Sequence, residues 1–196
     1  DLAADARDAA IWDGDWTTLL DCDAWPAAPV RAAPDRLTIG RHSRPDPLKW
    51  PDPEERALVY PYDPALRFVM RGVDARLSEQ LAPWPANWTF QPFGHGGISE
   101  FLTGLDVYSY YHGRRWIEAF GYNVLEALAS GLPTVLPPSF APLFGEAALY
   151  AEPAEAHGLY DRLSGDPAAR AAQGALARRL AAERFGLDLY GPRVAA

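Results

Sequence analysis

The sequence contains a single cysteine, Cys22, among its 196 residues. One cysteine can form neither an intramolecular disulfide nor a cysteine-rich metal site, so a reducing compartment is expected and we predict a cytoplasmic location. Long apolar runs are also absent, and none approaches the roughly 18 to 20 residues that a membrane helix needs. The opening residues lack the basic and apolar regions of a signal peptide. This chain gives no indication of membrane contact.

Basic residues are in the minority, with 18 lysines and arginines against 26 acidic residues and a net charge of −8. Nucleic acids and anionic membranes bind broad basic surfaces, so the composition argues against nucleic acid as a partner. A bound phosphate would need a local cluster of cations. Hydrophobic residues make up 48% of the chain, enough to bury the core of one domain.

Signatures of several common enzyme classes are missing. The sequence has no Gly-x-Ser-x-Gly elbow and no glycine-lysine phosphate loop. Its four histidines lack the spacing of metal ligands, and no acidic cluster offers an octahedral oxygen site. We therefore predict neither a metal nor a cofactor.

Helix and strand signals alternate from residue 36 onward, with little polar alternation inside the strands. Such a pattern predicts an α/β fold with a doubly wound parallel sheet, covered by helices on both faces, whose ligand lies beyond the carboxyl ends of the strands. The expected strands are 36–41, 66–71, 88–91, 107–111 and 134–136, and the expected helices are 53–59, 73–81, 98–105, 123–129, 154–163 and 167–184. Residues 137–146 are expected to form a proline-rich loop.

Residues 1–34 differ in composition from the rest of the chain. Residues 1–34 combine alanine, aspartate, tryptophan and proline and show no element beyond a short helix. We interpret this segment as an interdomain connection or the tail of a preceding domain. Residues 35–196 are expected to form the Rossmann-like domain.

The most informative stretch is 116–135, which has the pattern of a loop, a helix, a turn and a strand. Asn123 and Glu126 have the spacing of an N-cap and a capping box, and Gly131 and Pro133 end the helix. On one continuous helix, Glu118 and Glu126 would lie about 80° out of line and about 12 Å apart. If Glu118 instead lies in the loop and Glu126 in the first turn, both carboxylates and the N–H groups of residues 120–124 can surround one phosphate-containing ligand.

The same stretch resembles the retaining glycosyltransferases of the GT-B fold, in particular glycosyltransferase family four. The resemblance rests on two glutamates separated by seven residues within Glu-Ala-Phe-Gly-Tyr-Asn-Val-Leu-Glu-Ala-Leu-Ala-Ser-Gly-Leu-Pro-Thr-Val. It implies that Glu126 binds the ribose hydroxyls of a nucleotide-sugar donor and that Glu118 contacts the transferred sugar. The backbone that would bind sugar and diphosphate belongs to Ala119, Phe120, Gly121, Tyr122, Asn123 and Val124. Taken singly, Glu126 could equally be a capping residue and Glu118 a solvated loop acid.

A basic cluster follows the first expected strand, at residues 40–50. Arginine and lysine suit a departing diphosphate, although surface cations in a solvated loop would look the same. The resemblance makes Lys49 the counterpart of a diphosphate-binding lysine. Arg41 directly follows the glycine, whereas Arg44 has the closer spacing to Lys49, so both arginines remain candidates.

Residues 92–97 follow the third expected strand and are rich in glycine. By resemblance, Phe93 and Gly94 border the nucleobase; a purely structural turn is an equal alternative. The loop lacks the context of a dinucleotide-binding fingerprint.

The resemblance covers about residues 36–185 and only the C-terminal, donor-binding half of a GT-B enzyme. It implies a retaining, metal-independent hexosyltransferase, with Glu118, Arg44 and Lys49 as catalytic residues and an N-terminal acceptor domain as a further partner. Two alternatives stay open, a nucleotide-sugar epimerase of the GT-B fold and a non-catalytic nucleotide-sugar-binding module.

Overall fold

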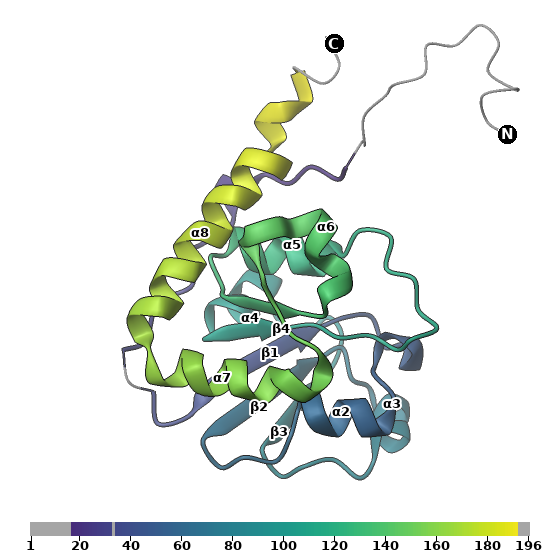
Figure 1. Cartoon of the computed structure of the whole chain (residues 1–196). Helices are drawn as coiled ribbons and strands as arrows, with labels where there is room; N and C mark the ends of the chain where they lie inside the picture. The colour runs from purple at the N-terminus through teal and green to yellow at the C-terminus, as the bar shows by residue number, and fades with distance from the viewer. Residues whose placement is uncertain (1–16, 33, 192–196) are drawn as a thin grey trace, which may run out of the picture.

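A parallel six-stranded sheet forms the centre of the protein, as a computed structural model of residues 17–32 and 34–191 shows (Figure 1). The strand order is β3-β2-β1-β4-β5-β6, and every neighbouring pair is parallel. The strands are β1 (Leu37–His42), β2 (Leu66–Arg71), β3 (Trp88–Gln91), β4 (Val107–Ser109), β5 (Thr134–Leu136) and β6 (Leu149–Tyr150). The predicted doubly wound α/β fold is confirmed.

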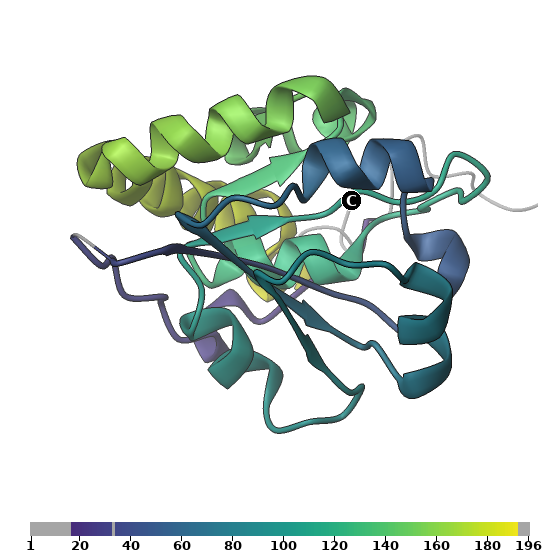
Figure 2. The ribbon, with the colours of Figure 1, turned by 90° about the horizontal axis from the view of Figure 1, so that it is seen from below.

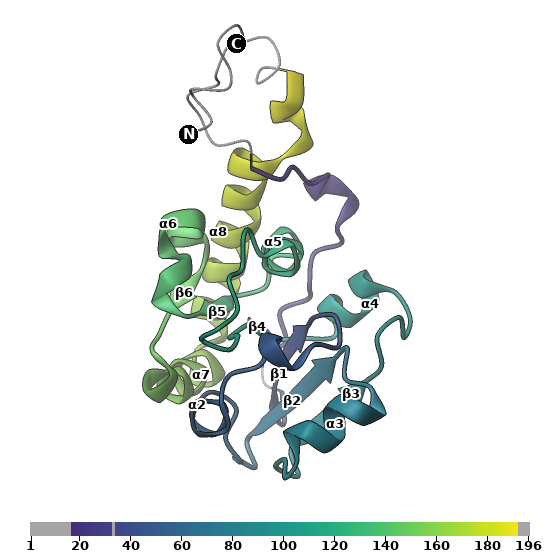
Figure 3. The same ribbon diagram turned by 90° about the vertical axis from the view of Figure 1, so that its right-hand side faces the viewer.

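Helices cover both faces of this sheet, which explains why the central strands are almost continuously buried. The α-helices are α2 (Pro53–Val59), α3 (Ala75–Leu81), α4 (Ile98–Thr103), α5 (Tyr122–Ala129), α6 (Ala141–Phe144), α7 (Ala156–Gly165) and α8 (Pro167–Phe185). Apolar side chains of α2, α3 and α7 form the core on one face, and those of α4, α5 and α8 belong to the core on the other. Figure 2 shows α2 and α7 side by side on their face, and Figure 3 shows α5 beside α8.

All the elements predicted from the sequence are present, with ends shifted by one or two residues, but the segment after β5 was predicted wrongly. Instead of an irregular loop, it contains the 3-10 turns η3 (Pro138–Phe140) and η4 (Gly145–Ala147), helix α6 between them and then strand β6. Proline favours the first turn of a helix, where its missing N–H costs nothing. The prolines that indicated a loop therefore begin short helical turns.

The segment before β1 packs against the C-terminal helix. Leu20 forms a bridge with Gly186, and its N–H donates to the carbonyl of Phe185 at 2.8 Å. Arg31 donates from Nε to Asp106 Oδ1 at 2.9 Å. The remaining 3-10 turns are η1 (Cys22–Ala24), η2 (Pro47–Lys49), η5 (Pro153–Glu155) and η6 (Leu187–Leu189).

The predicted division at residue 34 remains a prediction, and residues 1–16 lie outside the described part of the chain. Within the described part, no helix has the length and hydropathy needed to cross a membrane.

Candidate functional site

The site is built where the chain changes direction across the sheet. From β1 the chain continues to β2 and β3 on one side, whereas β4 is followed by β5 and β6 on the other. The loops leaving the carboxyl ends of β1 and β4 therefore diverge, and ligands of doubly wound folds bind at such a switch point. Of the predicted residues, Arg44 and Lys49 lie on the loop after β1, residues 118–121 on the loop after β4 and residues 122–126 on α5. Arg41 lies on β1 itself.

The loop after β1 is shaped by local hydrogen bonds. The carboxylate of Asp46 accepts from the N–H of Leu48 at 2.9 Å, which begins the turn η2 that presents Lys49. The Gly113 N–H donates to the carbonyl of Leu48 at 3.0 Å. A Cβ atom on Gly113 would lie 2.9 Å from the carbonyl oxygens of Leu48 and Trp50, so only glycine allows the two loops to approach this closely.

Arg41 lies beneath the site rather than on its surface. Its side chain is completely buried, and its guanidinium donates to the carbonyls of Tyr111 at 2.9 Å and Lys49 at 2.6 Å. The guanidinium carbon lies 4.0 Å from the ring centre of Trp50 and 5.0 Å from that of Tyr110. In this arrangement Arg41 ties the loop after β1 to the loop after β4. Arg44, by contrast, is exposed on the loop and makes no hydrogen bond or ion pair with any other described residue.

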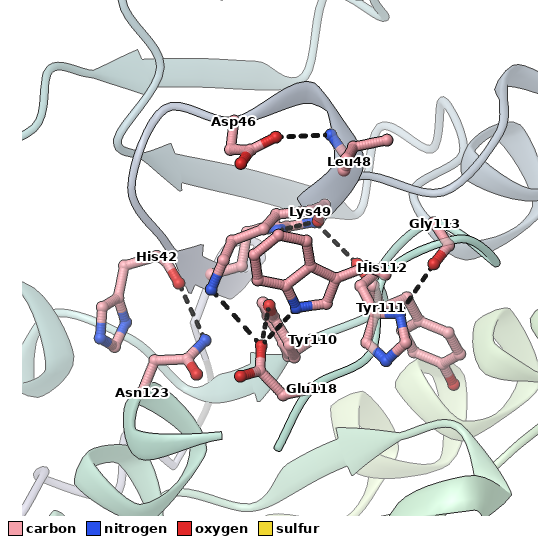
Figure 4. Close-up of polar contacts among 12 residues, drawn as sticks. His42, Asp46, Leu48, Lys49, Tyr110, Tyr111, His112, Gly113, Glu118 and Asn123 are labelled. Atoms are coloured by element: carbon pink, nitrogen blue, oxygen red, sulfur yellow. Dashed lines mark hydrogen bonds and ion pairs between the residues drawn. The ribbon is translucent and has the colours of Figure 1, made fainter. Parts of the chain in front are cut away.

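Glu118 is the centre of a polar cluster at the carboxyl ends of β1 and β4 (Figure 4). Its Oε2 accepts from Tyr110 Oη at 2.9 Å, Trp116 Nε1 at 3.1 Å and Lys49 Nζ at 3.4 Å. Burial alone would raise the pKa of Glu118, but these hydrogen bonds and the charge of Lys49 hold it below its ordinary value. Glu118 is therefore an ionised, oriented carboxylate and not a solvated loop acid.

The start of α5 differs from the prediction that Asn123 caps it. The N-cap is Gly121, whose φ of 81° is a left-handed conformation that suits glycine, and no side chain caps the helix. Asn123 already lies inside the helix, where its amide donates at 3.0 Å to both the carbonyl of His42 and Oη of Tyr108. The N–H groups of Tyr122 and Asn123, the first two residues of α5, therefore have no acceptor among the described residues.

Glu126 is the fifth residue of α5, beyond the expected first turn, and it forms no capping box. Its Oε2 lies 2.7 Å from Nε2 of His42, a residue at the end of β1. The side chains of this pair are 14% and 9% exposed, respectively. The capping interpretation of Glu126 is thus wrong, because the carboxylate points to a neighbouring strand instead of its own helix.

The other predicted positions of the α5 region have mixed exposure. Ala119 and Tyr122 are exposed, and Phe120 is half-buried against Phe144 and Phe185. Val124 is buried, and its N–H already donates to the carbonyl of Gly121 at 2.9 Å. The amide of Val124 is therefore engaged before any ligand arrives.

The glycine-rich loop after β3 borders a cavity of about 260 Å³. Arg71 holds this loop by donating to the carbonyls of Gly97 at 2.9 Å and Gly96 at 2.7 Å. The cavity is lined by His42, Ser43, Arg71, Phe93, Gly94, Gly96 and Ile98. The predicted Phe93 and Gly94 thus share a cavity with the residue that contacts Glu126, and the 63% exposed ring of Phe93 can meet a flat ligand.

Among the described residues, one group of three side chains could reach a single metal ion, namely Asp63, His157 and Asp161. Asp63 precedes β2 and therefore lies at the amino ends of the strands. This group belongs to the opposite edge of the sheet from Glu118 and Glu126.

Sequence reasoning missed three residues that shape the site, namely His42, Tyr110 and Trp116. Tyr110 and Trp116 precede Glu118 by eight and two residues, so their closeness in sequence could have indicated a contact with this carboxylate. The contact of His42 with Glu126 joins positions 84 residues apart and had no local signal.

Comparisons with known proteins agree with this architecture. No protein-family model and no curated protein matches the chain. Among solved structures, HepE from Anabaena in complex with UDP and glucose gives a TM-score of 0.68 at 18% identity, covering 90% of this chain and 54% of HepE. TarM gives 0.64 at 17% identity, covering 86% and 37%. WaaG, a glycosyltransferase involved in lipopolysaccharide biosynthesis, gives 0.60 at 18% identity, covering 85% and 47%.

The chain thus spans about half or less of the length of these structures. At such identities the similarity is one of fold, and the chain has the Rossmann-like fold of a domain of the GT-B glycosyltransferases.

Proposed function

We propose that the chain is the donor-binding half of a retaining glycosyltransferase, which transfers a sugar from a nucleoside-diphosphate sugar to an acceptor. The observation that carries this proposal is the grouping of Lys49, Glu118, the start of α5 and Glu126 at the switch point of the sheet. A cation, two carboxylates and a helix N-terminus at one edge suit the diphosphate, sugar and ribose of such a donor.

Lys49 and Arg44 would bind the diphosphate together with the first N–H groups of α5. The chain as a whole carries a net charge of −8, so this local group must supply the positive potential. Lys49 is preorganised for the task, since its ammonium lies 4.7 Å from the ring centre of Trp116 and 3.4 Å from Glu118 Oε2. Arg41 contributes by fixing the backbone of Lys49 from below.

The two carboxylates would take separate parts of the donor. Glu118, on the loop beside Lys49, would accept from hydroxyls of the transferred sugar, and Glu126 would accept from the ribose. Phe93 and Gly94 would border the base in the adjacent cavity. Solved structures of HepE contain UDP and UDP-glucose, which supports this class of ligand for the fold.

During transfer, the bond between the anomeric carbon and the diphosphate oxygen breaks, and its electron pair remains on the diphosphate. Lys49, Arg44 and the helix N-terminus would stabilise the charge that develops there. The proposal assigns this stabilisation to protein groups and invokes no metal or cofactor. The acceptor and an acceptor domain would be supplied outside this chain, and the reaction would take place in the cytoplasm.

Titration calorimetry of the chain with UDP, GDP and ADP, each beside its nucleoside, tests the proposal. We expect at least one diphosphate to bind with a Kd below about 1 mM and more tightly than its nucleoside. Failure of all three to bind a folded sample contradicts the proposal. NMR of a recovered nucleotide-sugar separates the alternatives, because an epimerase changes the configuration of a sugar carbon and a binding module leaves the donor intact.

A further inference from the structure

We infer that His42 is a positioning residue for ribose recognition, which donates a hydrogen bond to Glu126 and fixes that carboxylate for the hydroxyls of the donor ribose. The inference rests on the proposed function, because it assigns a supporting residue to the same nucleotide site. It concerns a side chain that neither the sequence motif nor the family resemblance singles out.

His42 and Glu126 have the geometry of a direct hydrogen bond. His42 Nε2 and Glu126 Oε2 are 2.7 Å apart, within the range of a charge-assisted hydrogen bond. Among the described residues, His42 is the one hydrogen-bond partner of the Glu126 carboxylate, and only Oε2 takes part. Oε1 is thus left to accept from ribose hydroxyls while the carboxylate is held through its other oxygen.

The protonation of the imidazole makes His42 a donor to Glu126. Burial lowers the pKa of His42 below its ordinary value of 6.5, even though Glu126 raises it in part. The ring is then neutral near pH 7 and has one N–H group. Since a carboxylate can only accept, the proton lies on Nε2, and Nδ1 is a bare acceptor. Nδ1 is buried and has no hydrogen-bond partner in the described protein.

The imidazole of His42 is itself held in place by its neighbours. Its ring makes edge-to-face contacts with Phe101 and Tyr108, at centroid distances of 5.7 and 5.4 Å. Its backbone carbonyl accepts from the amide of Asn123 at 3.0 Å, which ties the end of β1 to the first turn of α5 (Figure 4). A rigid donor on β1 therefore sets the direction of a carboxylate on α5.

His42 also connects the two compartments of the proposed site. It lines the cavity that contains Phe93 and Gly94, and on its other side it contacts Glu126. A ribose lies between the base and the diphosphate of any nucleoside diphosphate. The position of His42 between the proposed base cavity and the ribose carboxylate matches that order.

Two substitutions of His42 separate positioning from mere packing. In His42→Gln the amide nitrogen is the same number of bonds from Cα as Nε2 and can donate to Glu126. In His42→Asn the amide reaches only to the place of Nδ1 and cannot contact Glu126. The two variants have similar polarity, so comparing them isolates the hydrogen bond.

The experiment takes the diphosphate among UDP, GDP and ADP that binds wild-type protein most tightly and measures Kd for it and for its 2′-deoxy form by calorimetry. Glu126→Ala is the reference for lost ribose recognition. The discrimination ratio is the Kd of the 2′-deoxy diphosphate divided by the Kd of the ribose form. We expect this ratio to fall about tenfold in His42→Asn and to be largely restored in His42→Gln. Circular dichroism melts confirm that each variant is folded.

Three outcomes are decisive. An unchanged ratio in His42→Asn, with a reduced ratio in Glu126→Ala, overturns the inference and leaves the proposed function standing. Equal loss in His42→Asn and His42→Gln also overturns it, because the side chain would then act through packing alone. If wild-type protein binds none of UDP, GDP and ADP, or binds the ribose and 2′-deoxy forms of its diphosphate equally, ribose recognition by Glu126 fails and the inference fails with it.

Discussion

Replacing Lys49 by alanine should weaken the binding of a nucleoside diphosphate far more than that of the nucleoside. The Lys49 side chain is only 11% exposed and is oriented by Glu118 and Trp116 before any ligand binds. Little side-chain entropy is therefore lost on binding, so most of a charge-assisted hydrogen bond should be observed. Such a bond contributes roughly 1.5 to 3 kcal/mol, which corresponds to a loss of about tenfold to a hundredfold in affinity.

The same structure predicts how a second substitution acts. Without Lys49, the Glu118 carboxylate, whose side chain is only 14% exposed, keeps its charge beside the diphosphate and repels it. Lys49→Ala/Glu118→Gln should therefore bind the diphosphate more tightly than Lys49→Ala alone. Simple addition of two independent losses predicts the opposite order.

The assay is titration calorimetry with a nucleoside diphosphate and its nucleoside, at low and high salt. Arg36→Ala is the matched control, because Arg36 is an exposed cation that precedes β1 at its amino end, away from the site. We expect Arg36→Ala to change neither Kd. Equal losses for diphosphate and nucleoside in Lys49→Ala would refute the reasoning, because they indicate general disruption of the fold.

Three further predictions concern the support of the site. Arg41→Met should lower the free energy of unfolding by about 2 to 5 kcal/mol in urea titrations, because two buried carbonyls lose a charged donor. The control Arg44→Met should change it by less than about 0.5 kcal/mol, because Arg44 is exposed. Similar stability of the two variants would contradict the structure. Gly121→Ala should cost about 1 to 2 kcal/mol in the same titration, because of its positive φ, while Gly158→Ala, an exposed position of α7 with no atom within 4 Å of the new Cβ, should be neutral or stabilising. His42 should make the free energy of unfolding depend on pH. Burial foremost, and the charges of Arg71 and Arg41, lower the pKa of His42 in the folded protein. The contribution of neutral His42 to stability is therefore fully present above about pH 6.5 and is lost as the pH falls toward the lowered folded pKa. His42→Gln should flatten the difference in unfolding free energy between pH 7.5 and 5.5, and an equal slope in both proteins would show that His42 does not titrate this way.

Much of the fold was predictable because its elements carry local signals. Strand β2 is rich in apolar residues and ends directly before Gly72, and the helices between the strands contain good helix formers. Strand β6 was missed because two residues carry no periodic pattern. Helix α6 was missed because its prolines favour a loop and a first helical turn equally well.

The site was only partly predictable, because several contacts join distant parts of the chain. The motif placed Glu118 on a loop and Glu126 on a helix, as the structure has them. The burial of Arg41 could not be foreseen, since both faces of a central strand are covered and its sequence pattern does not show which side chains reach the surface. The start of α5 was misplaced because Asn123 is a good capping residue in general, whereas here the left-handed Gly121 precedes the helix.

Lys49 is the only lysine in the sequence, so 13C-labelled lysine gives one side-chain NMR signal from the proposed site. That signal, followed during titration with UDP, GDP and ADP and with their nucleosides, tests the central claim most directly. Our account predicts that at least one diphosphate shifts it saturably, at the concentrations at which calorimetry shows binding, and that the nucleosides leave it nearly unchanged. A diphosphate that binds by calorimetry without moving the Lys49 signal would contradict the location of the site.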